Sequence, residues 1–142
     1  MKNFIVILLM SLVFFSCKEE KKKPNEEFIM YQSSEMAALM NTIYEGNMTI
    51  KNKILQGELL GGFLETYLNI YSAVLTNPAN RNASFEAFSK LYIKNMKQVY
   101  SGSKDSLKQN FNQAVNSCIA CHKTTCIGPI PRIKKLLIKL NS

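Results

Sequence analysis

Residues 105–122 read DSLKQNFNQAVNSCIACH, and the fold that we predict is built outward from this stretch. Its apolar and chemically active side chains recur three or four residues apart, which places them on one face of an α-helix. We therefore expect an amphipathic helix that carries two thiols and an imidazole at its C-terminal end. The residues of this face are Leu107, Phe111, Ala114, Val115, Cys118 and His122.

The last five residues of the stretch form the pattern Cys-x-x-Cys-His. Cys118 and Cys121 are three positions apart, and His122 is the only histidine of the sequence. Two thiols at this spacing can add to the two vinyl groups of a porphyrin, and the adjacent imidazole can bind its iron. The pattern predicts one covalent haem c, with His122 as the proximal iron ligand.

Three further amphipathic segments precede this helix. The first covers residues 33–57 and starts with serines that suit an N-terminal cap, while Gly46 and Asn47 are expected to kink or interrupt it. The second covers about residues 58–76, and the third covers about residues 84–100. Four helices with short links predict an antiparallel four-helix bundle, which places cofactors between facing helices.

The chain leaves this pattern after His122. Gly128 and Pro129 should stop the fourth helix, and Pro131 suits the first turn of a new one. In residues 132–140 the apolar side chains of Ile133, Leu136, Leu137 and Leu140 recur at helical spacing among basic ones, which predicts a short amphipathic helix. The expected fold class is therefore all-α, an antiparallel four-helix bundle with a short extra C-terminal helix.

The N-terminus predicts an export signal in residues 1–16. Lys2 precedes the apolar run Phe4 to Phe15, which is too short to span a bilayer and suits the core of a signal peptide. Ser16 and Cys17 follow, as in bacterial lipoprotein signals, in which the cysteine is lipidated and begins the mature chain. An ordinary signal peptide and an uncleaved membrane anchor are the alternatives.

Residues 17–30 contain a dense run of charges and predict a solvated tether between the lipid anchor and a single domain over residues 31–142. The formal net charge of the 142-residue chain is +8, which favours an acidic partner or an anionic membrane surface. Nucleic acid is disfavoured as a partner because export would remove the protein from it. We expect the protein at the outer membrane, on its periplasmic side or at the cell surface.

A four-helix bundle with Cys-x-x-Cys-His on its last long helix resembles the cytochrome c′ family. The resemblance covers about residues 33–123 and implies that a residue of the first helix faces the second side of the iron. An apolar residue there implies a five-coordinate iron that binds nitric oxide or carbon monoxide, and a methionine implies a six-coordinate iron suited to electron transfer. Met40, and after it Met36, stand in the matching region, although methionine is also common core filler. The resemblance also implies a homodimer.

The sequence departs from the family at Cys126, where members commonly carry a basic residue near the haem. We interpret Cys126 first as a buried small residue, and otherwise as a free thiol beside the haem or an intermolecular disulfide partner. The extra basic helix is also outside the family pattern. Its lysines could steer an acidic redox partner, or they could simply be solvated or lie against anionic lipid. These lysines are Lys134, Lys135 and Lys139.

The favoured function is electron transfer by a membrane-anchored monohaem cytochrome. An enzyme is not indicated, because no second histidine and no paired-carboxylate or Ser/His/Asp arrangement can be placed. One alternative keeps the haem as a gas-binding or sensing site. Another, without haem, is a disulfide-stabilised helical lipoprotein or a structural zinc site. The four residues available to zinc are Cys118, Cys121, His122 and Cys126.

Overall fold

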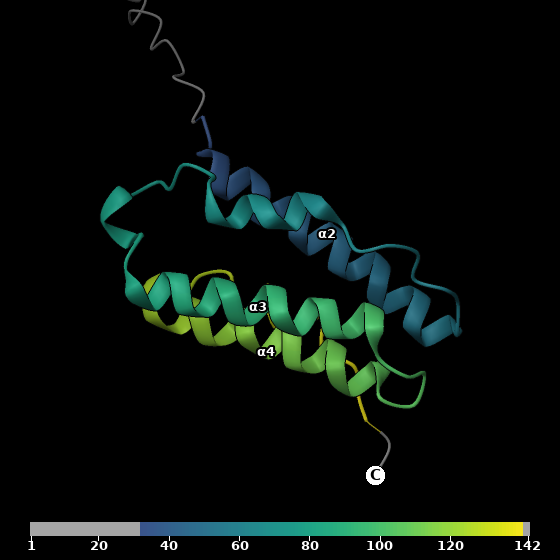
Figure 1. The fold of residues 1–142 in the computed structure, drawn as a ribbon. Helices are drawn as coiled ribbons and strands as arrows, with labels where there is room; N and C mark the ends of the chain where they lie inside the picture. The colour runs from purple at the N-terminus through teal and green to yellow at the C-terminus, as the bar shows by residue number, and fades with distance from the viewer. Residues whose placement is uncertain (1–31, 141–142) are drawn as a thin grey trace, which may run out of the picture. The chain divides into compact units, whose positions relative to one another are not determined.

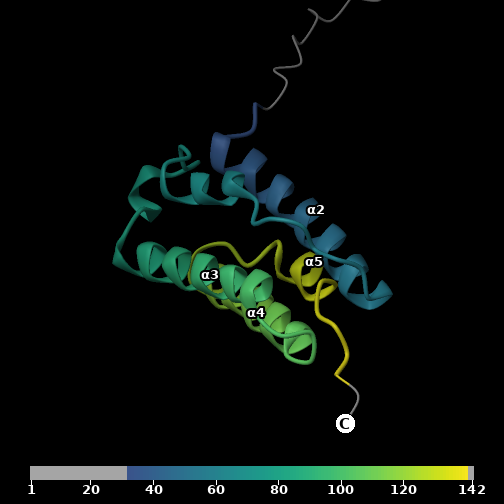
Figure 2. The same cartoon turned by 45° about the vertical axis from the view of Figure 1, so that its right-hand side comes forward.

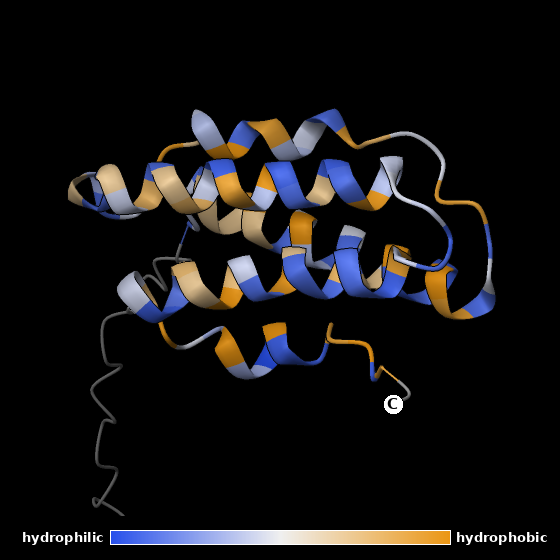
Figure 3. Cartoon of the chain, turned by 60° about the horizontal axis from the view of Figure 1, so that its bottom comes forward, coloured by the Kyte–Doolittle hydropathy of each residue, from blue (hydrophilic) through white to orange (hydrophobic). Residues whose placement is uncertain are grey.

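The computed structural model describes residues 32–140, so the expected signal peptide, Cys17 and the charged tether lie outside the described residues. The described chain is helical and without strands, which confirms the all-α fold class. Hydrophobic and hydrophilic residues are interspersed along each of its helices (Figure 3). None of the described helices is long and apolar enough to cross a membrane. In chain order the elements are α2 (Glu35–Gln56), the 3-10 segments η2 (Glu65–Tyr71) and η3 (Pro78–Asn80), α3 (Ala83–Ser101), α4 (Leu107–Thr125) and α5 (Ile130–Lys134).

Helices α3 and α4 lie side by side as an antiparallel pair (Figures 1 and 2). The Asn95 amide of α3 donates to the Ser117 hydroxyl of α4 over 2.7 Å, and the Asn110 amide of α4 donates to the Gln98 carbonyl of α3 over 3.3 Å. A later residue of α3 thus meets an earlier residue of α4. The interface supplies the most deeply buried part of the core, which includes Met96, Val99, Phe111, Ala114 and Val115.

Helix α2 pairs in the same antiparallel sense with the segment that follows it. Ser34 caps α2 by accepting a hydrogen bond from the Ala37 N–H over 3.1 Å. Near this end of α2, the Met36 N–H donates to the Val74 carbonyl over 3.0 Å. Farther along α2, Gly46 lies against the ring of Tyr67 in η2. This pair covers the other side of the core from α4 (Figure 1).

The prediction of an α-helix over residues 58–76 is wrong. Residues 58–64 are not helical, and the helical turns of this region are confined to η2, which is wound as a 3-10 helix. Gly61 has a φ of +79°, in the left-handed region that favours glycine and ends helical geometry. The adjacent Leu60 is half-buried and Leu59 is 92% exposed, so this stretch has little apolar burial to hold it in a helix.

The expected interruption of α2 is also wrong, because the helix continues through Gly46 and Asn47. A Cβ atom at Gly46 would meet the Tyr67 hydroxyl and lie 3.1 Å from the ring carbon that bears it. The glycine therefore allows the close approach of η2. Asn47 is 1% exposed and donates its amide to the Tyr92 hydroxyl over 3.1 Å, so this buried polar side chain has a partner.

The C-terminal helix is shorter than the predicted 132–140 and ends at Lys134, although Pro131 occupies its first turn as expected. The chain then runs on without helical structure. The N–H groups of residues 135–137 still bond to carbonyls three residues earlier, and Lys51 of α2 donates to the Lys135 and Leu137 carbonyls over 2.6 and 3.2 Å. Figure 2 shows α5 beside α2, and α5 also packs on α4. We call residues 126–140 the C-terminal segment.

Candidate functional site

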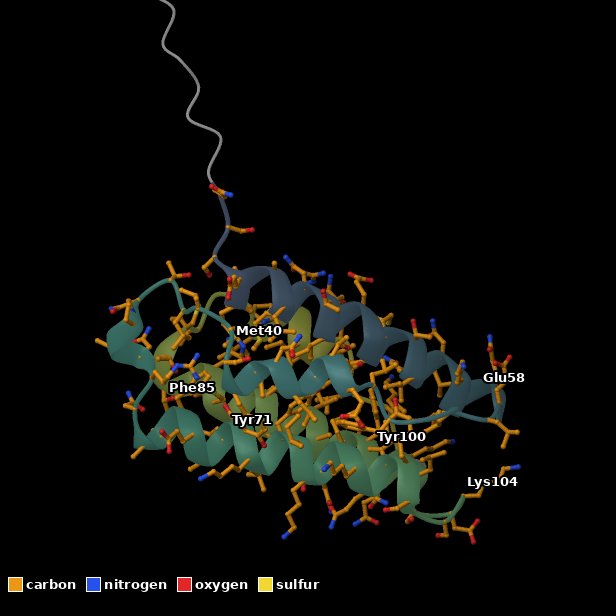
Figure 4. All side chains as sticks on the ribbon, turned by 45° about the horizontal axis from the view of Figure 1, so that its top comes forward. Met40, Glu58, Tyr71, Phe85, Tyr100 and Lys104 are labelled. Carbon is orange, nitrogen blue, oxygen red and sulfur yellow. The ribbon has the colours of Figure 1, made fainter. Side chains whose placement is uncertain are left out.

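An apolar pocket of about 530 Å³ lies between α2, the start of α3, the end of α4 and the C-terminal segment. Its volume falls in the range of roughly 300–1,000 Å³ that is usual for small-molecule and cofactor sites. Met40 and Phe85, which both line it, lie toward the end of the helices opposite to Glu58 and Lys104 (Figure 4). Its apolar and aromatic walls include Met36, Met40, Ile43, Tyr44, Leu75, Phe85, Ile133 and Leu136.

The last turns of α4 present the predicted haem motif to this pocket. Cys118, Cys121 and His122 all line it, and they also line a second cavity of about 40 Å³ between α4, α2 and α3. Three and four residues along a helix return to the same face, which explains why one helix end can supply all three groups. The structure thus brings together two thiols and one imidazole at an apolar wall.

The ring of His122 is oriented by the end of α4. Its Nδ1 lies 2.9 Å from the carbonyl oxygen of Cys126, which can only accept a hydrogen bond. Nδ1 therefore carries the proton, and in the neutral ring Nε2 keeps a free lone pair. Metal-binding histidines commonly donate their second ring nitrogen to a carbonyl in this way, which fixes the tautomer and raises the basicity of the ligand.

Both motif thiols are held in their neutral form. Burial, and after it the nearby Cys121, raises the pKa of Cys118 from 9.0 to about 12. The Cys118 thiol donates a hydrogen bond to the Ala114 carbonyl over 3.5 Å. Burial also raises the pKa of Cys121. At neutral pH these side chains are therefore uncharged, which suits contact with the edge of a large apolar cofactor.

The interpretation of Cys126 as a buried small residue is wrong, because Cys126 is exposed. It lines the rim of the pocket and, through its main-chain carbonyl, holds His122. Within residues 32–140, no three Cys, His, Asp or Glu side chains come together in a way that could hold a metal ion.

Met36 and Met40 of α2 line the same pocket as His122 of α4. Met36 is 7% exposed and Met40 is half-buried, and Met40 also lines the smaller cavity beside the motif. Both methionines named from the sequence are thus placed at the pocket. Two methionine side chains therefore stand on a wall that is built by α2 and not by α4.

Arg132 is a pocket residue that sequence reasoning missed. Its guanidinium donates to the Asn41 side-chain oxygen over 2.8 Å and to the Glu45 carboxylate over 2.9 Å, and it lies 3.9 Å from the ring centre of Tyr44. The sequence placed Arg132 only on the basic face of a short helix. Arg132 and Glu45 are 87 residues apart, so no spacing in the sequence relates them.

Comparison with known proteins found no family model, no curated protein and no solved structure that matches this chain. The site is therefore interpreted from its own geometry and chemistry.

Proposed function

We propose that this protein is a lipid-anchored monohaem c-type cytochrome of the bacterial envelope that transfers electrons. One observation carries the proposal: Cys118, Cys121 and His122 stand together on the wall of an apolar pocket of cofactor size. Thioether bonds to the two cysteines and Nε2 of His122 would hold the haem. The bound group would supply a one-electron iron couple.

The chain's own residues fit this role in three ways. The apolar walls make the surroundings of a bound group less polar, which is one of the means by which a protein sets a reduction potential. The Cys126 carbonyl fixes the tautomer of His122 and leaves Nε2 free to act as a ligand. The neutral thiols of Cys118 and Cys121 add no charge to the wall at neutral pH.

Electron transfer is favoured over gas binding by the two methionines of α2. Met40, or Met36 in its place, offers a thioether sulfur as a second axial ligand, and a six-coordinate iron has no open position for carbon monoxide. An acidic redox partner is favoured by three exposed lysines of the C-terminal segment, which can steer such a protein by charge complementarity. These are Lys134, Lys135 and Lys139.

Covalent attachment is tested on the full chain, exported from a host that can attach haem. We expect a denaturing gel stained for haem to show a band for the wild type and for Cys126→Ser. Cys118→Ser and Cys121→Ser should weaken the stain, and the double variant should abolish it. Cys126→Ser is a matched control because it removes a third pocket thiol without touching the motif. A wild type without haem would refute the proposal.

The second axial ligand is tested by optical spectra of the oxidised, reduced and carbon-monoxide-treated protein. The wild type should give low-spin spectra that carbon monoxide does not change, and Met40→Ala should bind the gas. Met48→Ala is the matched control, because Met48 lies on the same helix and does not line the pocket. A high-spin wild type that binds carbon monoxide would replace electron transfer with gas binding.

The anchor is tested at Cys17. Growth with a labelled fatty acid should label the wild type and leave Cys17→Ala unlabelled, and fractionation should release that variant from the membrane. A labelled Cys17→Ala protein would contradict lipidation at this residue.

A further inference from the structure

Arg132 is the one permanently charged side chain among the described residues that line the main pocket. It reaches the pocket from α5, whereas its partners Asn41, Tyr44 and Glu45 belong to neighbouring turns of α2. A cationic side chain at the edge of apolar walls is complementary to a ligand with a large apolar body and an anionic group.

The guanidinium of Arg132 has spare hydrogen-bonding capacity. It carries five N–H donors, and in the described part of the chain Asn41 and Glu45 each accept from one of them. The side chain is 47% exposed, so a further acceptor can approach it. Contact with the face of Tyr44 at 3.9 Å holds the guanidinium in place. A second carboxylate can therefore bind without displacing the first.

The existing ion pair presents little competition. The side chain of Glu45 is 69% exposed, and exposed ion pairs contribute little net free energy because water solvates and screens both charges. Glu45 therefore orients the Arg132 guanidinium but competes only weakly with a second carboxylate for it. Asn41 supplies a neutral acceptor on the same helix face, which keeps the guanidinium positioned when Glu45 is altered.

From this geometry we propose that Arg132 binds a carboxylate of the pocket's ligand, which on the proposed function is a propionate side chain of the haem. The C-terminal segment then recognises the polar edge of the cofactor, while α4 binds its iron and its vinyl-derived carbons. Arg132 also anchors α5 to α2 through Asn41 and Glu45, so binding of the carboxylate would add a further contact that holds the segment against α2.

The experiment uses the full chain, produced without haem attachment, and two porphyrin probes. The first is mesohaem, whose ethyl groups cannot form thioethers, and the second is mesohaem dimethyl ester, whose propionates are blocked. Absorbance titration gives the affinity for each. We expect the wild type to bind the free acid roughly fivefold more tightly than the diester, the size of one partly solvated charge-assisted hydrogen bond.

Three variants identify Arg132 as the source of this preference. Arg132→Gln should bind the two probes equally, whereas Lys134→Gln, an exposed lysine of the same helix, should keep the fivefold preference. Glu45→Gln keeps Arg132 and removes its anionic partner, so it should raise the preference above that of the wild type. This variant decides the question if Arg132→Gln does not fold.

The outcomes separate this proposal from the proposed function. Equal binding of both probes by the wild type, or an unchanged preference in Arg132→Gln, would overturn the role of Arg132 and leave the haem site in place. Failure of the wild type to bind either probe would overturn both.

Discussion

Asn112 of α4 holds the C-terminal segment against the helices, and loss of its side chain should increase the fraction of molecules in which that segment is detached. Its amide nitrogen donates to the Ile138 carbonyl over 2.8 Å, and its side-chain oxygen accepts from the Ile138 N–H over 2.9 Å. Both backbone groups of one residue are thus satisfied by one side chain. Leu136, two residues earlier, is 2% exposed and forms part of the pocket wall.

The cost of Asn112→Ala follows from the two bonds that it removes. A hydrogen bond contributes about 0.5–1.5 kcal/mol net, so the pair stabilises the bound segment by about 1–3 kcal/mol. This corresponds to an increase of roughly fivefold to 150-fold in the population of the open segment. Because α2, α3 and most of α4 keep their packing, the effect should be local to residues 126–140.

Limited proteolysis with trypsin measures this population. Arg132, Lys134 and Lys135 provide cleavage sites within the segment, and cleavage follows the population of the open state when opening is fast. Asn112→Ala should be cleaved there faster by that factor. Asn116→Ala, an exposed asparagine one turn farther along the same helix, should match the wild type. Equal rates for the two variants would refute the reasoning, and so would faster cleavage spread over all helices.

Three further predictions concern buried parts of the protein. Tyr67→Phe should raise the free energy of unfolding in urea by about 1 kcal/mol, because the Tyr67 hydroxyl is buried and has no partner among the described residues; Gly46→Ala should destabilise the wild type by about 1–3 kcal/mol and the Tyr67→Phe protein less. The third prediction is a pH dependence of the stability of the protein produced without haem attachment. Burial raises the pKa of Cys118 from 9.0 to about 12, so the folded state retains this proton, and the stabilisation is complete below pH 9 and lost toward pH 12. Cys118→Ala should fall less steeply over that window, by up to about 1.4 kcal/mol per pH unit, and equal slopes would contradict the shift.

The parts of the fold that could be predicted have local causes. Ser34 accepts from the N–H three residues ahead, and Gly57 ends α2 with a φ of +73°. Both signals are contained in a few adjacent residues. The buried face of α4 follows in the same way from apolar side chains at helical spacing, which is why residues 105–122 were assigned correctly as helix, apart from the first two positions.

The region between α2 and α3 could not be predicted because its apolar spacing fits more than one structure. Leucines and aromatics recur at three and four residues there, yet only Tyr67, Ile70 and Ala73 become buried. The conformation is decided by contacts with distant residues, chiefly the approach of Tyr67 to Gly46. A small residue in the middle of a helix predicts a kink as readily as it predicts such an approach.

The candidate site also has one part that local sequence spacing predicts and one part that depends on the path of the chain. Cys118, Cys121 and His122 are neighbours in one helix, so their meeting at one wall follows from the sequence alone. Arg132 reaches the pocket only through the path of the chain after α4, which no local pattern specifies. On the proposed function, the motif would provide the attachment chemistry that c-type sites share. The C-terminal segment, which is outside the cytochrome c′ pattern, adds the pocket's permanent charge and part of its apolar wall. If the pocket holds haem as proposed, the features that distinguish it from the haem sites of c-type cytochromes should therefore depend on that segment.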